Sequence, residues 1–247
     1  MGEIRFVHDE IEGELRFRTP RWAEFAAWWD TTVRGSPSDA AHNLVAGCAI
    51  APDANALAAE FEDGLGFLPA AIADRLLDHV GAPEDGFGKR YPVVTLQEAE
   101  EARAQASALD AQITALPDTG HEEQLRPLLA ARAALEDKLI APEIVAAAKK
   151  GTKRAPLFVR VPTGVWAFRA PGARAGGAYT DAVAAFRGGR GGASLAEASR
   201  LLVLSCVLSP SAEVAAAQIQ EHPHIVYTLA DALCEAGGGA GKGLRGV

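Results

Sequence analysis

Two stretches of this chain, LVAGCAIAPDA at residues 44–54 and LVLSCVLSPSA at residues 202–212, carry one signature, L-V-x-x-C-x-[I/L]-x-P-x-A, at an offset of 158 residues. A cysteine that recurs in this way is open to four interpretations: a disulfide, a metal site, a redox couple or a duplicated fold. Of these, only duplication predicts that the neighbouring sequence also matches on both sides.

The neighbouring sequence does match. Upstream of the first signature lies LRFRTP, with Phe17, Arg18 and Pro20, and upstream of the second lies WAFRAP, with the same F-R-x-P element. Downstream, AIADRLLDHVG at residues 71–81 aligns with TLADALCEAGG at residues 228–238 if one residue is inserted in the first copy. These landmarks follow one order in both copies, so the sequence predicts an internal duplication.

Each copy opens with the pattern of a β-hairpin. Ile4 and Phe6, then Leu15 and Phe17, alternate with polar residues around a Gly-containing turn, and LFVRVPTGVWAFRA at residues 157–170 does the same around Pro-Thr-Gly. Helical periodicity follows in both copies. In the first, Thr19 and Pro20 suit a helix start. The corresponding helix of the second copy contains more glycine and no tryptophan, so we expect it to be the weaker one.

The next helix of each copy carries the cysteine on an apolar face. It is expected to start at Ser36 and Pro37 in the first copy and at a Ser194/Glu197 capping box in the second. Pro52 and Pro210 are expected to end these helices. The faces predicted to point inward consist of Ala41, Leu44, Val45 and Cys48, and of Leu195, Ala198, Leu202 and Cys206. A free cysteine in this setting behaves as a small buried hydrophobe.

A last helix closes each copy, with Ile72 and Leu76 in the first matched by Leu229 and Leu233 in the second. Between the copies, Ala102, Ala106, Leu109, Ile113 and Leu116 form a seam with alternating spacings of four and three, and Leu128, Ala131, Leu135 and Leu139 continue a similar pattern. Residues 97–150 therefore predict an antiparallel helical hairpin. Pro127 is expected to kink or delay its second helix.

The expected fold class is mainly α with small β-hairpins (α+β), in which two repeated units of a β-hairpin plus helices are separated by an antiparallel helical hairpin. The expected domains are residues 1–90 for the first repeat, 91–154 for the inserted hairpin and a basic linker, and 155–247 for the second repeat with a flexible Gly-rich tail.

Composition excludes several classes of protein. The chain has 247 residues and a net charge of -8, which argues against a nucleic-acid-binding surface over the whole molecule. The longest apolar run, near Leu201 to Leu208, is too short to span a membrane, and the N-terminus lacks the pattern of a signal peptide. Three cysteines are typical of a reducing compartment. We therefore expect a cytoplasmic protein.

No enzyme motif stands out. AGGGAGKG at residues 236–243 lacks the first Gly and the final Ser or Thr of a phosphate-binding loop. His222 and His224 lie at an expected helix start, where turn and capping roles are commoner than catalysis. The cysteines have no second Cys or His at metal-ligand spacing. The sequence therefore predicts no catalytic, metal-binding or cofactor-binding residue and no cofactor.

The order of these motifs resembles that of phage tail assembly chaperones, small proteins encoded near the tail genes of long-tailed bacteriophages and related contractile systems. The similarity lies in LRFRTPRWAEF and CAIAPDANAL in the first copy and in WAFRAP and CVLSPSAEV in the second. This chain departs from the family in having two units plus an inserted arm. The resemblance implies a non-enzymatic protein that binds a tail component, the tape-measure or tube protein, until assembly.

The first expected helix provides a candidate binding surface. Four aromatic residues crowd it, and Trp28 lies about 100° around the helix from Trp29, so part of the cluster is expected at the surface. The candidate partner-binding residues are Trp22, Phe25, Trp28 and Trp29. The opposing interpretation is that the hairpin or the arm covers them. The 97–150 hairpin is a second candidate, for self-association.

Other functions stay open. A structural tail or baseplate component or a general helical adaptor would share the same repeats. A small-molecule enzyme would need a pocket with a perturbed acid or base.

Overall fold

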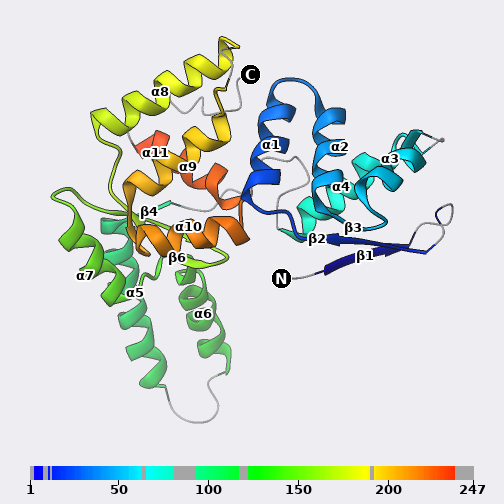
Figure 1. Cartoon of the computed structure of the whole chain (residues 1–247). Coiled ribbons are helices and arrows are strands. Elements are labelled where there is room, and N and C mark those ends of the chain that lie inside the picture. The colour runs from blue at the N-terminus through cyan, green and yellow to red at the C-terminus, as the bar shows by residue number, and fades with distance from the viewer. Residues whose placement is uncertain are drawn as a thin grey trace. The chain divides into compact units, whose positions relative to one another are not determined.

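The computed structural model describes residues 3–7, 11, 13–62, 65–80, 93–116, 122–189 and 192–236. It is mainly helical, with one antiparallel sheet of three strands and one of four (Figure 1). The predicted fold class is thus confirmed. The Gly-rich tail proposed for residues 237–247 lies outside the described residues, as does most of the AGGGAGKG stretch.

The two copies have the same order of elements. The first contains β1 (Glu3–Val7), β2 (Glu14–Arg18), α1 (Trp22–Val33), α2 (Pro37–Cys48), β3 (Ala49–Ala51), α3 (Ala54–Glu62) and α4 (Leu68–His79). The second contains β5 (Leu157–Val161), β6 (Gly164–Phe168), α8 (Ala173–Arg187), α9 (Leu195–Cys206), β7 (Val207–Ser209), α10 (Ala212–Glu221) and α11 (Ile225–Ala236). Cys48 and Cys206 are the last residues of equivalent helices, as the duplication predicts.

Strand pairing repeats down to the register. In the first sheet, Phe17 pairs with Ala49 and Arg16 with Ala51, with a shift in register between them. In the second sheet, Phe168 pairs with Val207 and Ala167 with Ser209, with the shift at the same place. The prolines that follow, Pro52 and Pro210, both have cis peptide bonds.

The short strands β3 and β7 correct one expectation. We expected Pro52 and Pro210 to end the cysteine helices, but those helices end at Cys48 and Cys206, and a strand of three residues precedes each proline. The strand forms because the hairpin next to it offers an unpaired edge, and three residues are too few to show a period in the sequence.

The start of α1 lies two residues later than predicted. Arg21, rather than Thr19, is the residue before the first turn, and its backbone N–H donates to the Glu24 carboxylate at 2.9 Å. In the second copy, the Ser194 hydroxyl accepts from the Glu197 N–H at 3.0 Å, as predicted. The Glu197 carboxylate also accepts two hydrogen bonds from the Arg200 guanidinium, at 2.8 and 2.9 Å.

The segment between the copies contains β4 (Val93–Thr95), α5 (Leu96–Thr114), α6 (Glu122–Ala133), the 3-10 turn η1 (Glu136–Lys138) and α7 (Pro142–Gly151). Helices α5 and α6 form the predicted antiparallel hairpin, and Arg132 of α6 donates to Asp110 of α5 at 3.0 Å. Pro127 lies inside α6, so it does not delay the start of the second helix, and whether it kinks the helix stays a prediction. The helix ends at Ala133 instead of continuing to Leu139.

The chain folds into two compact units whose limits do not follow the repeats. One unit comprises Met1–Arg90, Pro171–Ser205 and Glu213–Val247, and the other comprises Tyr91–Ala170 and Cys206–Ala212. The helices of both repeats therefore share the first unit. The hairpin and β7 of the second repeat belong to the second unit, together with the inserted helices.

Both predicted cysteine faces are buried. Their eight residues are each less than 9% exposed, and Ile72, Leu76, Leu229 and Leu233 of the closing helices are buried as well. Helix α8, expected to be the weaker counterpart of α1, has 15 residues to the 12 of α1 and buries Phe186, whereas α1 buries four aromatic side chains.

Candidate binding site

The aromatic cluster of α1 lies in the core. Trp22, Phe25, Trp28 and Trp29 are between 2% and 8% exposed. Phe25 is central, with its ring centroid 5.5 Å from that of Trp28 and 6.1 Å from that of Trp29. The expectation that part of this cluster lies at the surface is therefore wrong.

Side chains of the second repeat cover part of this aromatic cluster. The spacing of the aromatic residues along α1 could not show this. Trp29 meets Tyr227 of α11 edge to face, with centroids 5.3 Å apart. The Trp22 indole N–H donates to Glu197 of α9 at 3.3 Å. The Arg200 guanidinium lies 6.0 Å from the centre of the Trp22 ring. Trp22 and Trp29 therefore join the two repeats. The proposed role of the four residues in partner binding stays an untested prediction without an exposed surface to support it.

Polar contacts reinforce this junction between repeats. Oδ1 of Asp30 on α1 accepts from the backbone N–H groups of Leu195 and Ala196, each at 3.0 Å, and so caps the start of α9. Arg34, just after α1, donates to the Ala193 carbonyl at 2.7 Å, and its guanidinium lies 4.7 Å from the centre of the Phe186 ring. Residues of α1 and of its C-terminal end thus make polar as well as aromatic contacts with the second repeat.

The F-R-x-P motif has a structural role in the first repeat. Arg18 donates to the Glu24 carboxylate and to the Gly47 carbonyl, both at 2.6 Å, and so ties β2 to α1 and to the end of α2. Burial works to raise the pKa of Glu24, but bonds from Arg18 and the Arg21 backbone outweigh it and leave that pKa lowered. Arg18 of the motif therefore has a structural role, because its hydrogen bonds connect β2 with α1 and α2.

Cys48 is the last residue of α2 and follows Gly47, whose carbonyl accepts from Arg18. It is fully buried, and burial raises the pKa of its thiol to about 12, far above the range in which a thiol forms a nucleophilic thiolate at neutral pH. Cys206 is also buried, and within the described part of the chain Cys48, Cys206 and Cys234 form no disulfide. Among the described residues no three His, Cys, Asp or Glu side chains are grouped as metal ligands would be.

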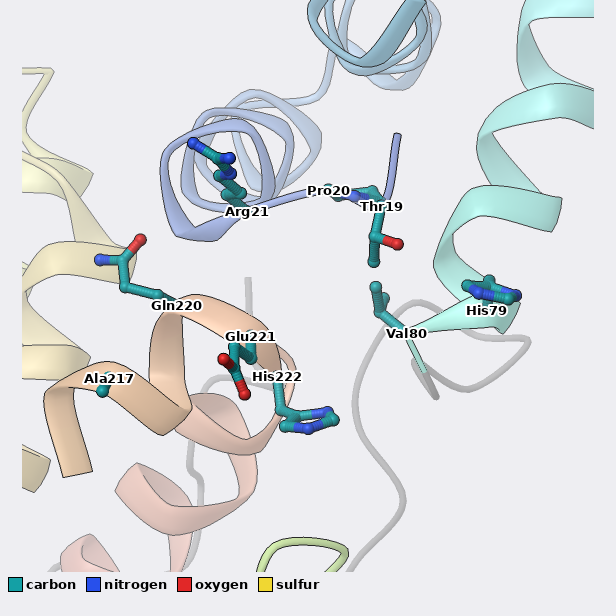
Figure 2. Close-up of a pocket in the computed structure, with 9 residues that line it drawn as sticks. All are labelled: Thr19, Pro20, Arg21, His79, Val80, Ala217, Gln220, Glu221 and His222. Carbon is teal, nitrogen blue, oxygen red and sulfur yellow. The ribbon is translucent and has the colours of Figure 1, made fainter. Parts of the chain in front are cut away.

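An open cleft of about 750 Å³ lies between the two repeats within the first compact unit. Figure 2 shows the elements around it: the residues leading into α1, the end of α4 and the end of α10. Its lining is Thr19, Pro20, Arg21, His79, Val80, Ala217, Gln220, Glu221 and His222. The sequence indicated only a turn or capping role for His222, and nothing in its pattern linked His222 to His79.

His224 lies next to this lining but in the core. It is 2% exposed, and its ring centroid lies 6.2 Å from that of His222. Neither of its ring nitrogens has a hydrogen-bond partner among the described residues. Burial, together with the neighbouring His222, lowers the pKa of His224 to about 4. The imidazole is therefore neutral at physiological pH.

The two hairpins differ in what completes them. In the second sheet, β4 pairs with the outer edge of β5, with Val93 opposite Val159, Val94 opposite Phe158 and Thr95 opposite Leu157. In the first sheet, β1 occupies the position of β5, and no strand among the described residues pairs with its outer edge. Val7, at the end of β1, is 79% exposed.

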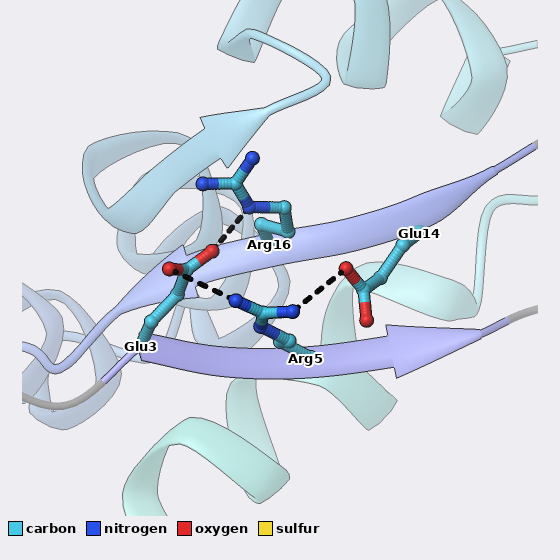
Figure 3. A network of polar contacts seen from close by, with 4 residues as sticks. All are labelled: Glu3, Arg5, Glu14 and Arg16. Carbon is cyan, nitrogen blue, oxygen red and sulfur yellow. Dashed lines mark hydrogen bonds and ion pairs between the residues drawn. The ribbon is translucent and has the colours of Figure 1, made fainter.

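The outer face of the second sheet is covered, whereas the corresponding residues of the first sheet are charged and largely exposed. Phe158 and Ala167 form a cross-strand pair in the second sheet and are buried in a cluster with Val94, Ile140, Val145 and Ala148. The equivalent pair in the first sheet is Arg5 and Arg16. Figure 3 shows these arginines with Glu3 and Glu14 on the same face, where Arg5 lies 3.5 Å from each carboxylate and Arg16 bonds to Glu3.

Strand β4 escaped sequence analysis because three residues carry no period. A signal was nevertheless present: Phe158 is apolar at a position where the first repeat has Arg5, which marks a face that the second repeat buries. Phe67, 95% exposed at the start of α4, was also missed.

Comparisons with protein-family models, with curated proteins and with solved structures found no match for this chain. None of its described helices combines the length and the apolar character needed to cross a membrane.

Proposed function

We propose that this chain is a non-enzymatic, chaperone-like binding protein that holds a phage tail component, the tape-measure or tube protein, during assembly. The family follows from the resemblance of its repeated motifs to tail assembly chaperones. The mode of binding follows from one observation, the outer edge of β1, with which no strand in the described part of the chain pairs. On this proposal, an extended segment of the partner adds to that edge as a further antiparallel strand.

The second repeat supports this mode because it contains the same arrangement in completed form. There, β4 lies on the edge of β5 in antiparallel register. The first repeat has the same hairpin and the same third strand, but its first strand is the sheet edge. An exposed strand edge presents a row of backbone donors and acceptors and is a template for pairing with another chain.

Co-expression tests the proposal. The tail components encoded beside this chain should stay soluble when expressed with it, without added nucleotide or metal. Val7→Lys should weaken this effect, because lysine on an edge strand blocks pairing. Leu201→Lys is the matched control, since Leu201 is also exposed, at 56%, but lies on α9. The proposal would be contradicted if the tail component stayed as soluble with Val7→Lys as with the wild type. It would also be contradicted if the chain bound no neighbouring tail component.

The alternatives predict other outcomes. A structural tail or baseplate component would remain in the finished particle, whereas a chaperone would be missing from it. A general adaptor would bind a partner unrelated to tails.

A small-molecule role is a second candidate, favoured by the cleft, whose lining includes Arg21, His79 and His222 as well as the Glu221 carboxylate. These side chains offer both donors and an acceptor to a small polar ligand. A ligand of this class should raise the melting temperature of the wild type and not that of an Arg21→Ala variant.

A further inference from the structure

We infer that the outer edge of β1 pairs with the β1 strand of a second copy of this chain, in an antiparallel register that places Ile4 on the two-fold axis. The two three-stranded sheets then form one continuous sheet of six strands. This dimer uses the edge that the proposed function assigns to the tail component, so the two occupants compete.

The two faces of β1 restrict which strand can pair with its outer edge, and in which register. Ile4 is buried on the inner face, while Glu3 and Arg5 are exposed on the outer face. Residues directly opposite each other in neighbouring strands point to the same side of a sheet, so a strand added to this edge must keep inner residues opposite inner residues. For two copies of β1, this condition allows only registers in which a residue lies opposite itself on the two-fold axis.

Charge separates these registers. An axis through Glu3 places two carboxylates opposite each other, and an axis through Arg5 places two guanidinium groups opposite each other; both arrangements are unfavourable. An axis through Phe6 places Arg5 opposite Val7. An axis through Ile4 places Glu3 of each copy opposite Arg5 of the other, which gives two ion pairs related by symmetry.

Arg5 is also the residue with most to gain. Within its own hairpin it lies opposite Arg16, a pair of like charges. Its contacts with Glu3 and Glu14 are 3.5 Å long, and its side chain is 57% exposed. A carboxylate from the other side, at the position that Glu3 of a second copy takes, offsets that repulsion.

The side chains of β1 define which residues any added strand needs. A strand that completes this edge should read, from its N-terminus, acidic opposite Arg5, apolar opposite Ile4 and basic opposite Glu3. Glu3, Ile4 and Arg5 of this same chain meet all three conditions. The segment is therefore complementary to itself.

Sedimentation of the purified chain, without any partner, tests the dimer. It should be measured from roughly 1 µM to 1 mM, which covers binding free energies of about 8 to 4 kcal/mol. The wild type should show a monomer–dimer equilibrium that weakens as salt is raised, because exposed ion pairs are screened. Arg5→Glu and Glu3→Arg should each weaken dimerisation by about tenfold or more, because each replaces two opposite-charge pairs by two like-charge pairs.

Mixing the two variants provides the decisive arm. The Arg5→Glu chain carries acids at both outer positions of β1, and the Glu3→Arg chain carries bases at both, so their equimolar mixture should form a heterodimer of near wild-type affinity. Arg75→Glu on α4 and Glu60→Arg on α3 are matched controls, since they make the same charge changes at exposed positions outside the sheet that contains β1. Far-UV circular dichroism and the melting temperature verify that each variant is folded. Should Glu3→Arg unfold, Glu3→Gln replaces it and should weaken the dimer less.

Three results overturn the inference: a wild type that is monomeric over the whole range, a dimer unaffected by Arg5→Glu, or folded variants that fail to pair when mixed. Each leaves the proposed function intact if co-expression still keeps the tail component soluble. Conversely, a dimer with no effect on any tail component confirms the pairing and contradicts the function.

Discussion

At the scale of single residues, His224 links the core to pH. It is buried with two ring nitrogens that have no partner among the described residues, and its pKa is lowered from 6.5 to about 4, first by burial and then by His222. The unfolded chain binds a proton near pH 6.5, whereas the folded chain does so only near pH 4. Stability is therefore unaffected at neutral pH and falls as the pH drops from about 6.5 to about 4.

We expect this one group to remove about 3 kcal/mol of stability by pH 4. His224→Leu should flatten the dependence of the free energy of unfolding on pH between 7 and 4, as measured by urea denaturation at a series of pH values. Leu201→Ala, which changes an exposed side chain and removes no titratable group, is the control, and its curve should follow that of the wild type. A variant at position 224 with an unchanged pH dependence would contradict the assignment.

Residues also mark the limit of prediction from sequence. The faces of Leu44, Val45 and Cys48 were predictable because helical spacing decides which side chains share a side. The burial of Trp22 and Trp29 was not, since Glu197 and Tyr227, which contact them, lie about 170 to 200 positions further along the chain. A local pattern tells which residues share a face but not what covers that face.

At the scale of elements, the inserted segment does more than link two copies. Strand β4 completes the edge of the second sheet, and α7 packs on β6 and β7. The buried cluster around Phe158 draws on β4, α5 and α7 as well as on the sheet itself. The second hairpin thus depends on residues that the first repeat lacks, and neither β4 nor α7 was predictable from the seam pattern that identified α5 and α6.

Equivalent positions in the two sheets should therefore respond differently to the same change. Phe158→Ala removes a fully buried ring and should cost about 3 to 5 kcal/mol of unfolding free energy. Arg5→Ala, at the matching position, removes only exposed ion pairs and should cost less than about 1 kcal/mol. Urea denaturation at low protein concentration, where the chain is monomeric, compares them. Equal costs would show that the first sheet also has a cover on its outer face.

At the scale of the whole molecule, the α5–α6 hairpin is the rival to β1 for self-association. Its buried residues, Ala99, Ala102 and Ala106, all lie in the first part of α5, and α6 buries none of its residues. Leu129 of α6 is 50% exposed. The outer part of the hairpin is therefore available to another molecule and adds little to its own core.

Replacing residues 107–133 by a short Gly-Ser linker separates the two possibilities. We expect the shortened chain to keep its melting temperature to within a few degrees and to dimerise as the wild type does in sedimentation. An Arg5→Glu substitution in that background should then weaken the remaining association by about tenfold or more, as it does in the full chain. Loss of the dimer on shortening alone would assign self-association to the 97–150 hairpin instead.

The cap that Asp30 provides for α9 also bears on the history of the gene. A freshly duplicated segment is redundant, and a deletion can return the gene to single length at no cost. Once the beginning of a helix in one copy relies on a carboxylate from the other, and once Trp22 and Trp29 of one copy are packed against the other, that route is closed. Each copy has become a part of the other, so selection now acts on the doubled gene as one indivisible unit.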